Sequence, residues 1–163
     1  MKTLVVYYSL EGNTKEAAEK IASSLGADIM ALVPVKDIPK KGLMKFIHGG
    51  SGATMGKGTE LQPYTLDAST YDAIIIGTPV WAGKPCTAIN QFLMDLKTPE
   101  KIIGAFAFAG GSAEKCLSIL CEKLPSIKHK VSLADRNSKK LAPENGSKLS
   151  AFIEELKSEL ISN

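Results

Sequence analysis

Five short stretches of the chain are largely apolar. They cover residues 3–8, 28–33, 71–77, 102–109 and, with a weaker pattern, 130–133. Their length and their β-branched and aromatic side chains favour buried strands over helices.

Between these stretches, apolar residues recur at the spacing of amphipathic helices. The first helix is predicted from Lys15 to Leu25, with Gly26 as its C-terminal cap. Pro85 suits the first position of the second helix, where an N–H would have no partner in any case. The apolar faces of the three later helices consist of Ile89, Phe92, Leu93 and Leu96; Cys116, Leu117, Leu120 and Leu124; and Leu149, Phe152, Ile153, Leu156 and Leu160.

Uniformly apolar strands that alternate with amphipathic helices predict an α/β fold with helices on both faces of a parallel sheet. Five such strands predict an open, doubly wound five-stranded sheet, whose ligands bind beyond the carboxyl ends of the strands. The sequence has 163 residues and no internal repeat or linker, so we expect residues 1–163 to form a single domain.

Composition narrows the functional class. No apolar stretch approaches the ~20 residues of a membrane span, and the N-terminus enters a strand with no signal-peptide pattern. We therefore expect no membrane span and a cytoplasmic location. The net charge of +3 is mild and the lysines are scattered, so charge does not suggest nucleic-acid binding.

The cysteines and histidines do not predict a disulfide framework or a metal site. Cys86, Cys116 and Cys121 are odd in number and lack C-x-x-C spacing, which is typical of reduced cytosolic thiols. His48 and His129 have no Cys, Asp or Glu at metal-ligand spacing. Cys86 is close to a candidate ligand loop, but a small apolar residue at a helix start is the favoured interpretation.

A short turn joins the first strand directly to the first helix. Such a turn leaves main-chain N–H groups at the helix start without internal partners, in a positive local field that suits a phosphate. The alternative is an ordinary turn capped by its own serine and threonine, and the turn alone does not distinguish the two. Its residues are Ser9, Leu10, Glu11, Gly12, Asn13 and Thr14.

Two further segments are expected at the same edge of the sheet. The only tryptophan lies in a predicted loop between two prolines, where an indole is suited to covering a flat aromatic ligand; the alternative is a tryptophan that plugs the rim of the core. In the second segment, glycines permit close backbone approach to a planar ring, or simply form a flexible turn. The segments are Thr78, Pro79, Val80, Trp81, Ala82 and Gly83, and then Ala109, Gly110, Gly111 and Ser112.

The glycine-rich segment 39–61 does not match a nucleotide-binding loop. A P-loop needs glycine five residues before Gly56, where the chain has Ser51, and it needs Ser or Thr after Lys57, where the chain has Gly58. We expect a short helix at 43–48 within a flexible connection. This connection either covers an edge of the ligand or is simply a surface loop.

The three edge segments, in this order, resemble those of the flavodoxin family. Ser9, Gly12 and Thr14 match its phosphate motif Ser/Thr-x-Thr-Gly-x-Thr, and the other two segments match its two flavin-flanking loops. The resemblance extends from end to end, and it is especially strong to bacterial proteins with a Gly-Gly connector, matched by residues 46–50. It implies the strand order 2-1-3-4-5.

The resemblance also implies non-covalent FMN. Residues 9–14 would hold the phosphate, Trp81 would stack on or flank the isoalloxazine, and residues 109–112 would line its other side. A backbone carbonyl near Gly83 would rotate to meet a flavin nitrogen. No protein side chain would be catalytic, because the flavin carries the electrons.

Three functions are weighed. The first is electron transfer between redox partner proteins, and the second is an NAD(P)H:quinone-type oxidoreductase that acts on small molecules. The third, a flavin-free response regulator, needs an aspartate at the end of the third strand, where the chain has Gly-Thr-Pro at 77–79. Both a monomer and a homodimer remain open.

Two features depart from the family pattern. Glu11 replaces the threonine that normally donates a hydroxyl to the phosphate, so we expect only its amide to take part and its carboxylate to face solvent. The isoelectric point near 8.7 is unlike that of the strongly acidic flavodoxins, whose acidic face steers basic partners.

Overall fold

The computed structural model describes residues 1–37 and 56–162. Within them, five parallel strands form a sheet in the order β2-β1-β3-β5-β6, and a short strand β4 pairs antiparallel with the end of β3. This arrangement confirms the predicted α/β fold and strand order. The strands are β1 (Thr3–Tyr7), β2 (Asp28–Ala31), β3 (Ala73–Trp81), β4 (Lys84–Pro85), β5 (Ile102–Ala109) and β6 (His129–Ala134).

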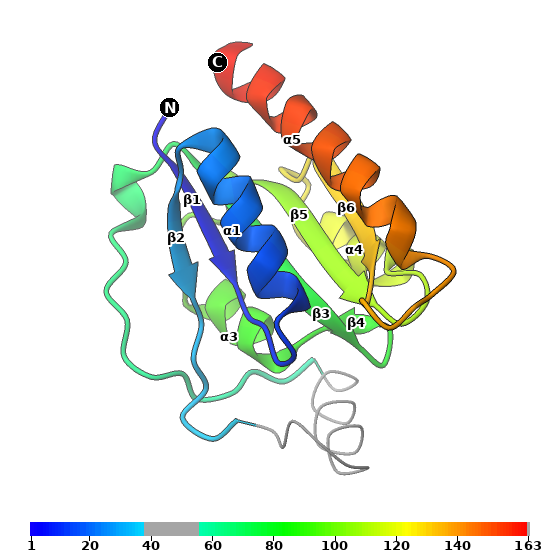
Figure 1. Ribbon diagram of the computed structural model, residues 1–163. Coiled ribbons are helices and arrows are strands. Elements are labelled where there is room, and N and C mark those ends of the chain that lie inside the picture. The colour runs from blue at the N-terminus through cyan, green and yellow to red at the C-terminus, as the bar shows by residue number, and fades with distance from the viewer. Residues whose placement is uncertain (38–55, 163) are drawn as a thin grey trace.

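Helices cover both faces of the sheet (Figure 1). One face carries α1 (Asn13–Leu25) and α5 (Asn145–Ser162), and the other carries α3 (Thr87–Asp95) and α4 (Glu114–Lys123). Single 3-10 turns at η1 (Ala68–Thr70), η2 (Pro99–Lys101) and η3 (Ala142–Glu144) join several of these elements. No helix in the described ranges has both the length and the hydrophobicity that crossing a membrane requires.

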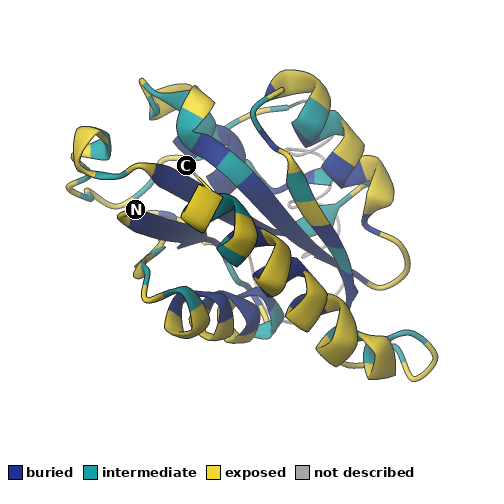
Figure 2. Ribbon diagram, turned by 90° about the horizontal axis from the view of Figure 1, so that it is seen from above, coloured by how far each residue is buried: buried dark blue, intermediate teal, exposed yellow. Residues whose placement is uncertain are grey.

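The strands divide the core into two layers because successive side chains point to opposite faces. Val5 and Ile75 pack beneath α1 and α5, whereas Val6 and Ile76 pack beneath α3 and α4, and all four are 0% exposed. Figure 2 shows the buried strands between helices whose outer faces are exposed. Burial on both faces explains why the strands are uniformly apolar in sequence.

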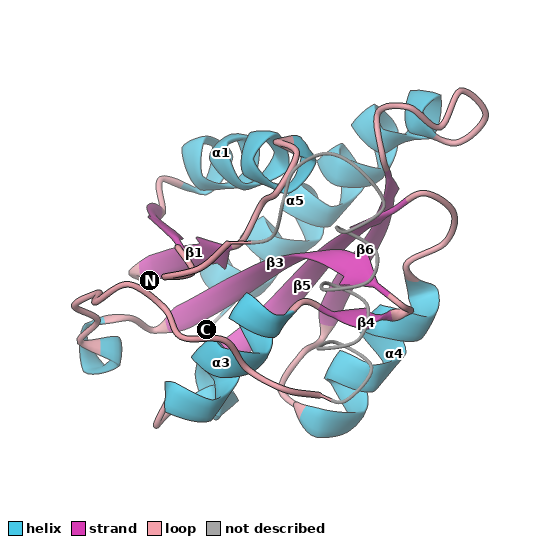
Figure 3. Ribbon diagram, turned by 90° about the horizontal axis from the view of Figure 1, so that it is seen from below, coloured by secondary structure: helices cyan, strands magenta, loops and turns pink. Residues whose placement is uncertain are grey.

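The end of β3 differs from its predicted loop. The strand continues through Trp81, and the chain then turns back as β4, so Trp81 lies in a β-hairpin (Figure 3). Pro85 belongs to β4, and α3 begins only at Thr87. The buried hydroxyl of Thr78 accepts a hydrogen bond from the Cys86 amide at 3.1 Å, which ties the two arms of the hairpin together.

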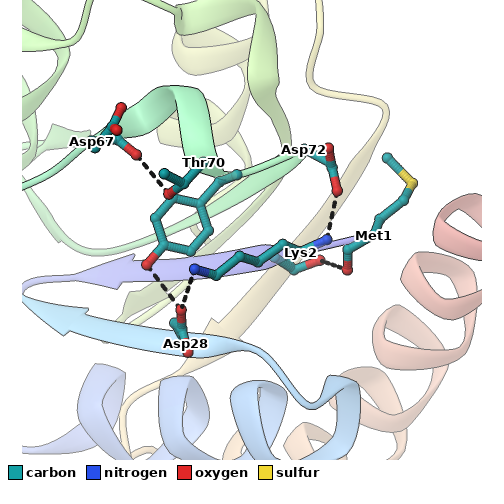
Figure 4. Close-up of polar contacts among 8 residues, drawn as sticks. Met1, Lys2, Asp28, Asp67, Thr70 and Asp72 are labelled. Atoms are coloured by element: carbon teal, nitrogen blue, oxygen red, sulfur yellow. Dashed lines mark hydrogen bonds and ion pairs between the residues drawn. The ribbon is translucent and has the colours of Figure 1, made fainter.

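Polar contacts close the edge of the sheet at the amino ends of the strands (Figure 4). The Lys2 amide donates to Asp72 Oδ2 at 2.6 Å, and the Lys2 ammonium lies 3.7 Å from Asp28 Oδ2. The Tyr71 hydroxyl donates to the same Asp28 oxygen at 2.9 Å. These contacts join the starts of β1, β2 and β3 on the side opposite to the candidate site. Being exposed, they add little stability.

The chain after β2 is only partly described. The predicted helix at 43–48 and most of the glycine-rich segment lie outside the described residues. β2 ends at Ala31 and not at Val33, and Pro34 then forms an isolated antiparallel bridge with Leu61.

Gly77 supplies a test of the core. A Cβ at this position would lie 2.1 Å from the Phe106 ring, which is fully buried. We expect Gly77→Ala to lower the free energy of unfolding by about 2–3 kcal/mol because overpacking forces the ring to move, and to lower Tm by about 4–12 °C.

The control for this variant is Gly146→Ala. Among the described residues nothing lies within 4 Å of a Cβ there, so urea unfolding should give wild-type stability or slightly more. Adding Phe106→Leu to Gly77→Ala should restore part of the loss. An unchanged midpoint for Gly77→Ala alone would contradict the packing explanation.

Candidate functional site

The turn between β1 and α1 presents main-chain donors. Gly12 is the N-cap of α1 with a left-handed φ of 97°, and its amide donates to Ser9 Oγ at 3.0 Å. The first intrahelical bond runs from the Glu16 amide to the Gly12 carbonyl at 3.0 Å. The amides of residues 13–15 therefore have no acceptor within the helix. Glycine has no side chain with which to cap them, so the turn is built as an anion site would be.

The side chains of this turn mostly point elsewhere. Leu10 and Thr14 are buried, at 9% and 2% exposure, and the Glu11 side chain is exposed, as expected. The Asn13 amide group donates to Asp135 Oδ1 at 3.1 Å, which engages it with the loop after β6. Backbone N–H groups, together with the Ser9 hydroxyl, are thus what the turn offers to a ligand.

Arg136 lies beside the same turn. Its Nε donates to Asn13 Oδ1 at 2.7 Å, and its Nη2 lies 3.8 Å from Glu16 Oε2. A Cβ on Gly12 would stand only 3.2 Å from that Nη2. No local sequence pattern marks this position. The one signal in the sequence is that Arg136 is the sole arginine among 20 basic residues.

The hairpin places Trp81 against Tyr8, the residue that follows β1. The two rings lie 5.6 Å apart between centroids with their planes at 83°, an edge-to-face contact. The Tyr8 hydroxyl donates to Asp37, and burial together with this bond raises the pKa of Tyr8. Trp81 packs on the core and remains half-buried, so part of its indole is accessible.

The tip of the hairpin has an unusual backbone. Val80 pairs with Pro85 and Trp81 with Lys84, which leaves a two-residue loop. Ala82 and Gly83 have φ values of 50° and 75°, and two-residue hairpin loops with positive φ at both positions match the twist of the strands. Ala82 is exposed, and Pro79, Val80 and Gly83 are half-buried.

The second flanking loop follows β5. Ala109 is buried, whereas Gly110, Gly111 and Ser112 are exposed. The Ala109 carbonyl accepts a hydrogen bond from the Asp135 amide at 2.8 Å. Ser112 Oγ accepts one from the amide of Glu114, the first residue of α4, at 3.2 Å.

Specific contacts bring the three predicted segments to one edge. The turn after β1 is joined to the hairpin through the contact of Tyr8 with Trp81. It is joined to the loop after β5 through Asp135, which bonds both Asn13 and Ala109. The sequence predicted these segments at the carboxyl ends of three strands, and the residues that connect them are Tyr8 and Asp135.

The nearby thiols are buried. Burial raises the pKa of Cys86 to about 11 and that of Cys116 to about 12, so both remain protonated at neutral pH. This supports the structural interpretation of Cys86. In the described part of the chain, no three His, Cys, Asp or Glu residues are grouped as a metal site needs.

Known proteins share this fold. A family model described as flavodoxin matches residues 2–144. The crystal structure of a flavoprotein in complex with FMN from Lactobacillus acidophilus NCFM is 25% identical, with a TM-score of 0.66, over 85% of this chain and 95% of that one. Oxidised flavodoxin 2 from Bacillus cereus is 19% identical, with a TM-score of 0.58, over 98% and 99% of the two chains; this likeness concerns the fold.

One curated relative carries the name of an enzyme. A protein from Geotalea uraniireducens (strain Rf4) named NAD(P)H dehydrogenase (quinone) is 32% identical over 98 residues, which are 57% of this chain. The match spans about half of that protein, 47% of its length.

The two tip residues should respond in opposite directions to substitution. Ala82→Gly should stabilise the protein by up to about 1 kcal/mol, because left-handed φ is costly only for residues with a Cβ. Gly83→Ala should destabilise it by about 1–2 kcal/mol for the same reason. Thermal unfolding of the two single variants measures both effects, and a loss of stability in Ala82→Gly would contradict the assigned backbone.

The thiols should react unequally with Ellman's reagent at pH 8. Cys121 is half-buried and should react first, whereas the raised pKa values of Cys86 and Cys116 should keep these two slow until the protein is denatured. Cys121→Ser should abolish the fast phase. A fast phase that persists in this variant would show that Cys86 or Cys116 is accessible.

Proposed function

The chain belongs to the flavodoxin family, and from that premise we propose that it binds FMN non-covalently at the carboxyl edge of the sheet and transfers electrons between redox partners. The observation that carries this proposal is the start of α1, where the amides of residues 13–15 face outward beyond a left-handed Gly12. A phosphate dianion satisfies these donors and complements the helix dipole.

Each of the three segments has a part in this proposal. The turn 9–14 holds the phosphate through its amides and the Ser9 hydroxyl. The hairpin supports the isoalloxazine on one side with the accessible part of Trp81, which also excludes water. The loop 109–112 approaches the ring from the other side, where no side chain stands at Gly110 or Gly111. Bound FMN supplies the electron-accepting and electron-donating chemistry.

The hairpin tip would meet the polar edge of the flavin. Because Ala82 and Gly83 both adopt positive φ, the peptide groups around them are held in an orientation that ordinary strands do not offer. The peptide groups of these two residues would form and break hydrogen bonds with the polar edge of the flavin as it gains or loses a proton. No acidic or basic side chain takes part in this proposal. The free thiols suit a reducing cytoplasm, which we propose as its location in a bacterial cell.

A second candidate function is the reduction of small molecules such as quinones at the expense of NAD(P)H. The name of the Geotalea relative favours it, although that match covers about half of the named protein. The two functions share the FMN site and differ in what delivers the electrons. Monomer and homodimer are both compatible with either.

FMN binding can be tested with the single tryptophan. Titration of the apoprotein with FMN should quench Trp81 fluorescence and flavin fluorescence together, because the indole lies beside the ring. The purified holoprotein should absorb visible light as a flavoprotein does, and denaturation should release one phosphorus per flavin. A colourless protein whose Trp81 fluorescence does not change when FMN is added would contradict the proposed function.

The same preparation separates the two candidate functions. Loaded with FMN and given NADPH or NADH with a quinone but no partner protein, an electron carrier should show no sustained NAD(P)H oxidation. Sustained turnover would favour the enzyme. Free FMN at the same concentration is the control for uncatalysed reduction.

A further inference from the structure

We propose that Arg136 is a second element of the phosphate site, a cation that makes the protein select the phosphorylated flavin over riboflavin. This inference rests on the proposed FMN function. It adds to the main-chain turn a charged side chain from the opposite end of the sequence.

Arg136 is held at the turn by a reciprocal network. Its Nε donates to Asn13 Oδ1 at 2.7 Å across 123 residues of sequence, and the other end of the Asn13 amide donates to Asp135 Oδ1 at 3.1 Å. Both ends of the Asn13 side chain are therefore engaged with the loop after β6. The network holds the guanidinium beside Gly12, where a Cβ would lie 3.2 Å from Nη2.

The guanidinium keeps donors for a ligand. An arginine has five N–H groups, of which one is used by Asn13. The contact with Glu16 is 3.8 Å long, an ion pair without a close hydrogen bond, and the Glu16 side chain is 83% exposed. The Arg136 side chain is itself 57% exposed, so it can adjust toward an anion without displacing the core.

The charges around the turn favour a cation there. Glu11, Glu16 and Asp135 are acidic residues in or beside the turn, and a phosphate dianion would add to the same negative field. Lys15 lies on the first turn of α1, but its ammonium pairs with Glu19 at 3.7 Å, farther along the helix. Arg136 is thus the cation that contacts the turn residues Gly12 and Asn13 in the described structure.

The chemistry of arginine suits this position better than that of lysine. A guanidinium is planar, stays charged, and can present two parallel N–H groups to phosphate oxygens while a third is bonded elsewhere. Lysine offers a point charge on a flexible stem. The chain uses lysine at its other 19 basic positions and arginine only here.

The neighbouring cavity adds a further observation. A cavity of about 290 Å³ lies between α1 and α5, and Asn13, Lys20, Arg136 and Asn145 are among its lining residues. Arg136 borders this open space and is 57% exposed, so replacing the guanidinium removes no packed core group.

The test compares two ligands that differ only in the phosphate. Dissociation constants for FMN and riboflavin are measured by quenching of flavin fluorescence, at low and high salt, for wild type, Arg136→Gln, Arg136→Lys and Lys139→Gln. Lys139 is an exposed lysine in the same loop, so its variant removes the same charge without touching the turn. Circular dichroism melts of the apoproteins accompany the titrations.

We expect Arg136→Gln to raise the FMN Kd about tenfold or more, the effect of losing a charge-assisted hydrogen bond, and to leave the riboflavin Kd within about twofold. Its FMN affinity should depend less on salt than that of wild type, since fewer charges are screened. Arg136→Lys should recover part of the loss, and Lys139→Gln should resemble wild type.

The outcomes separate this inference from the proposed function. If wild type binds neither flavin, both fail. If wild type binds FMN and Arg136→Gln binds it as Lys139→Gln does, only the role of Arg136 is overturned. An equal loss of FMN and riboflavin affinity would also overturn it, because the residue would then act on the fold of the site and not on the phosphate.

Discussion

The start of α1 is the constraint on which the candidate site depends. A helix that begins directly after a strand has N–H groups that the helix cannot satisfy, and an N-cap with a side chain would normally bond one of them. Here the N-cap is Gly12, whose own amide is bonded to Ser9. The next three amides are left for another partner. The left-handed φ of Gly12 disfavours any residue with a side chain at that position, and a Cβ there would also press on Arg136 Nη2 at 3.2 Å.

The parallel sheet then decides what can surround this helix end. The carboxyl ends of parallel strands meet at one edge of the sheet. The loops after β1, β3 and β5 therefore lie close together although they are far apart in the sequence. Side chains fix their separation: Tyr8 supports Trp81, and Asp135 joins Asn13 to Ala109. At the opposite edge, the Lys2 ammonium and the Tyr71 hydroxyl meet at Asp28, which ties together the starts of the strands.

Local patterns predicted the elements that local physics determines. β5 begins and ends where expected because residues 102–109 are apolar throughout, and α1 ends at Gly26, whose left-handed conformation closes the helix. The hairpin at the end of β3 was wrongly predicted as a loop. Its Thr-Pro and Ala-Gly pairs are turn signals in sequence, but pairing of Thr78 and Pro79 with β5 and of Trp81 with β4 extends the strand. The pairing with β5 is long-range and leaves no local trace, whereas the pairing with β4 is local and spans only Ala82 and Gly83.

The same reasoning explains why Arg136 has no sequence pattern. Its partner Asn13 is 123 residues away, and only the order of strands brings the loop after β6 near the loop after β1. The overall charge of +3 says little about this point, since the turn itself carries Glu11 and the neighbouring Lys15 pairs with Glu19. The proposed role of Arg136 bears on Glu11: the carboxylate takes the place of a hydroxyl donor in the family motif, and the guanidinium would supply a donor together with a positive charge. A site balanced in this way would depend on phosphate charge more than a neutral turn does.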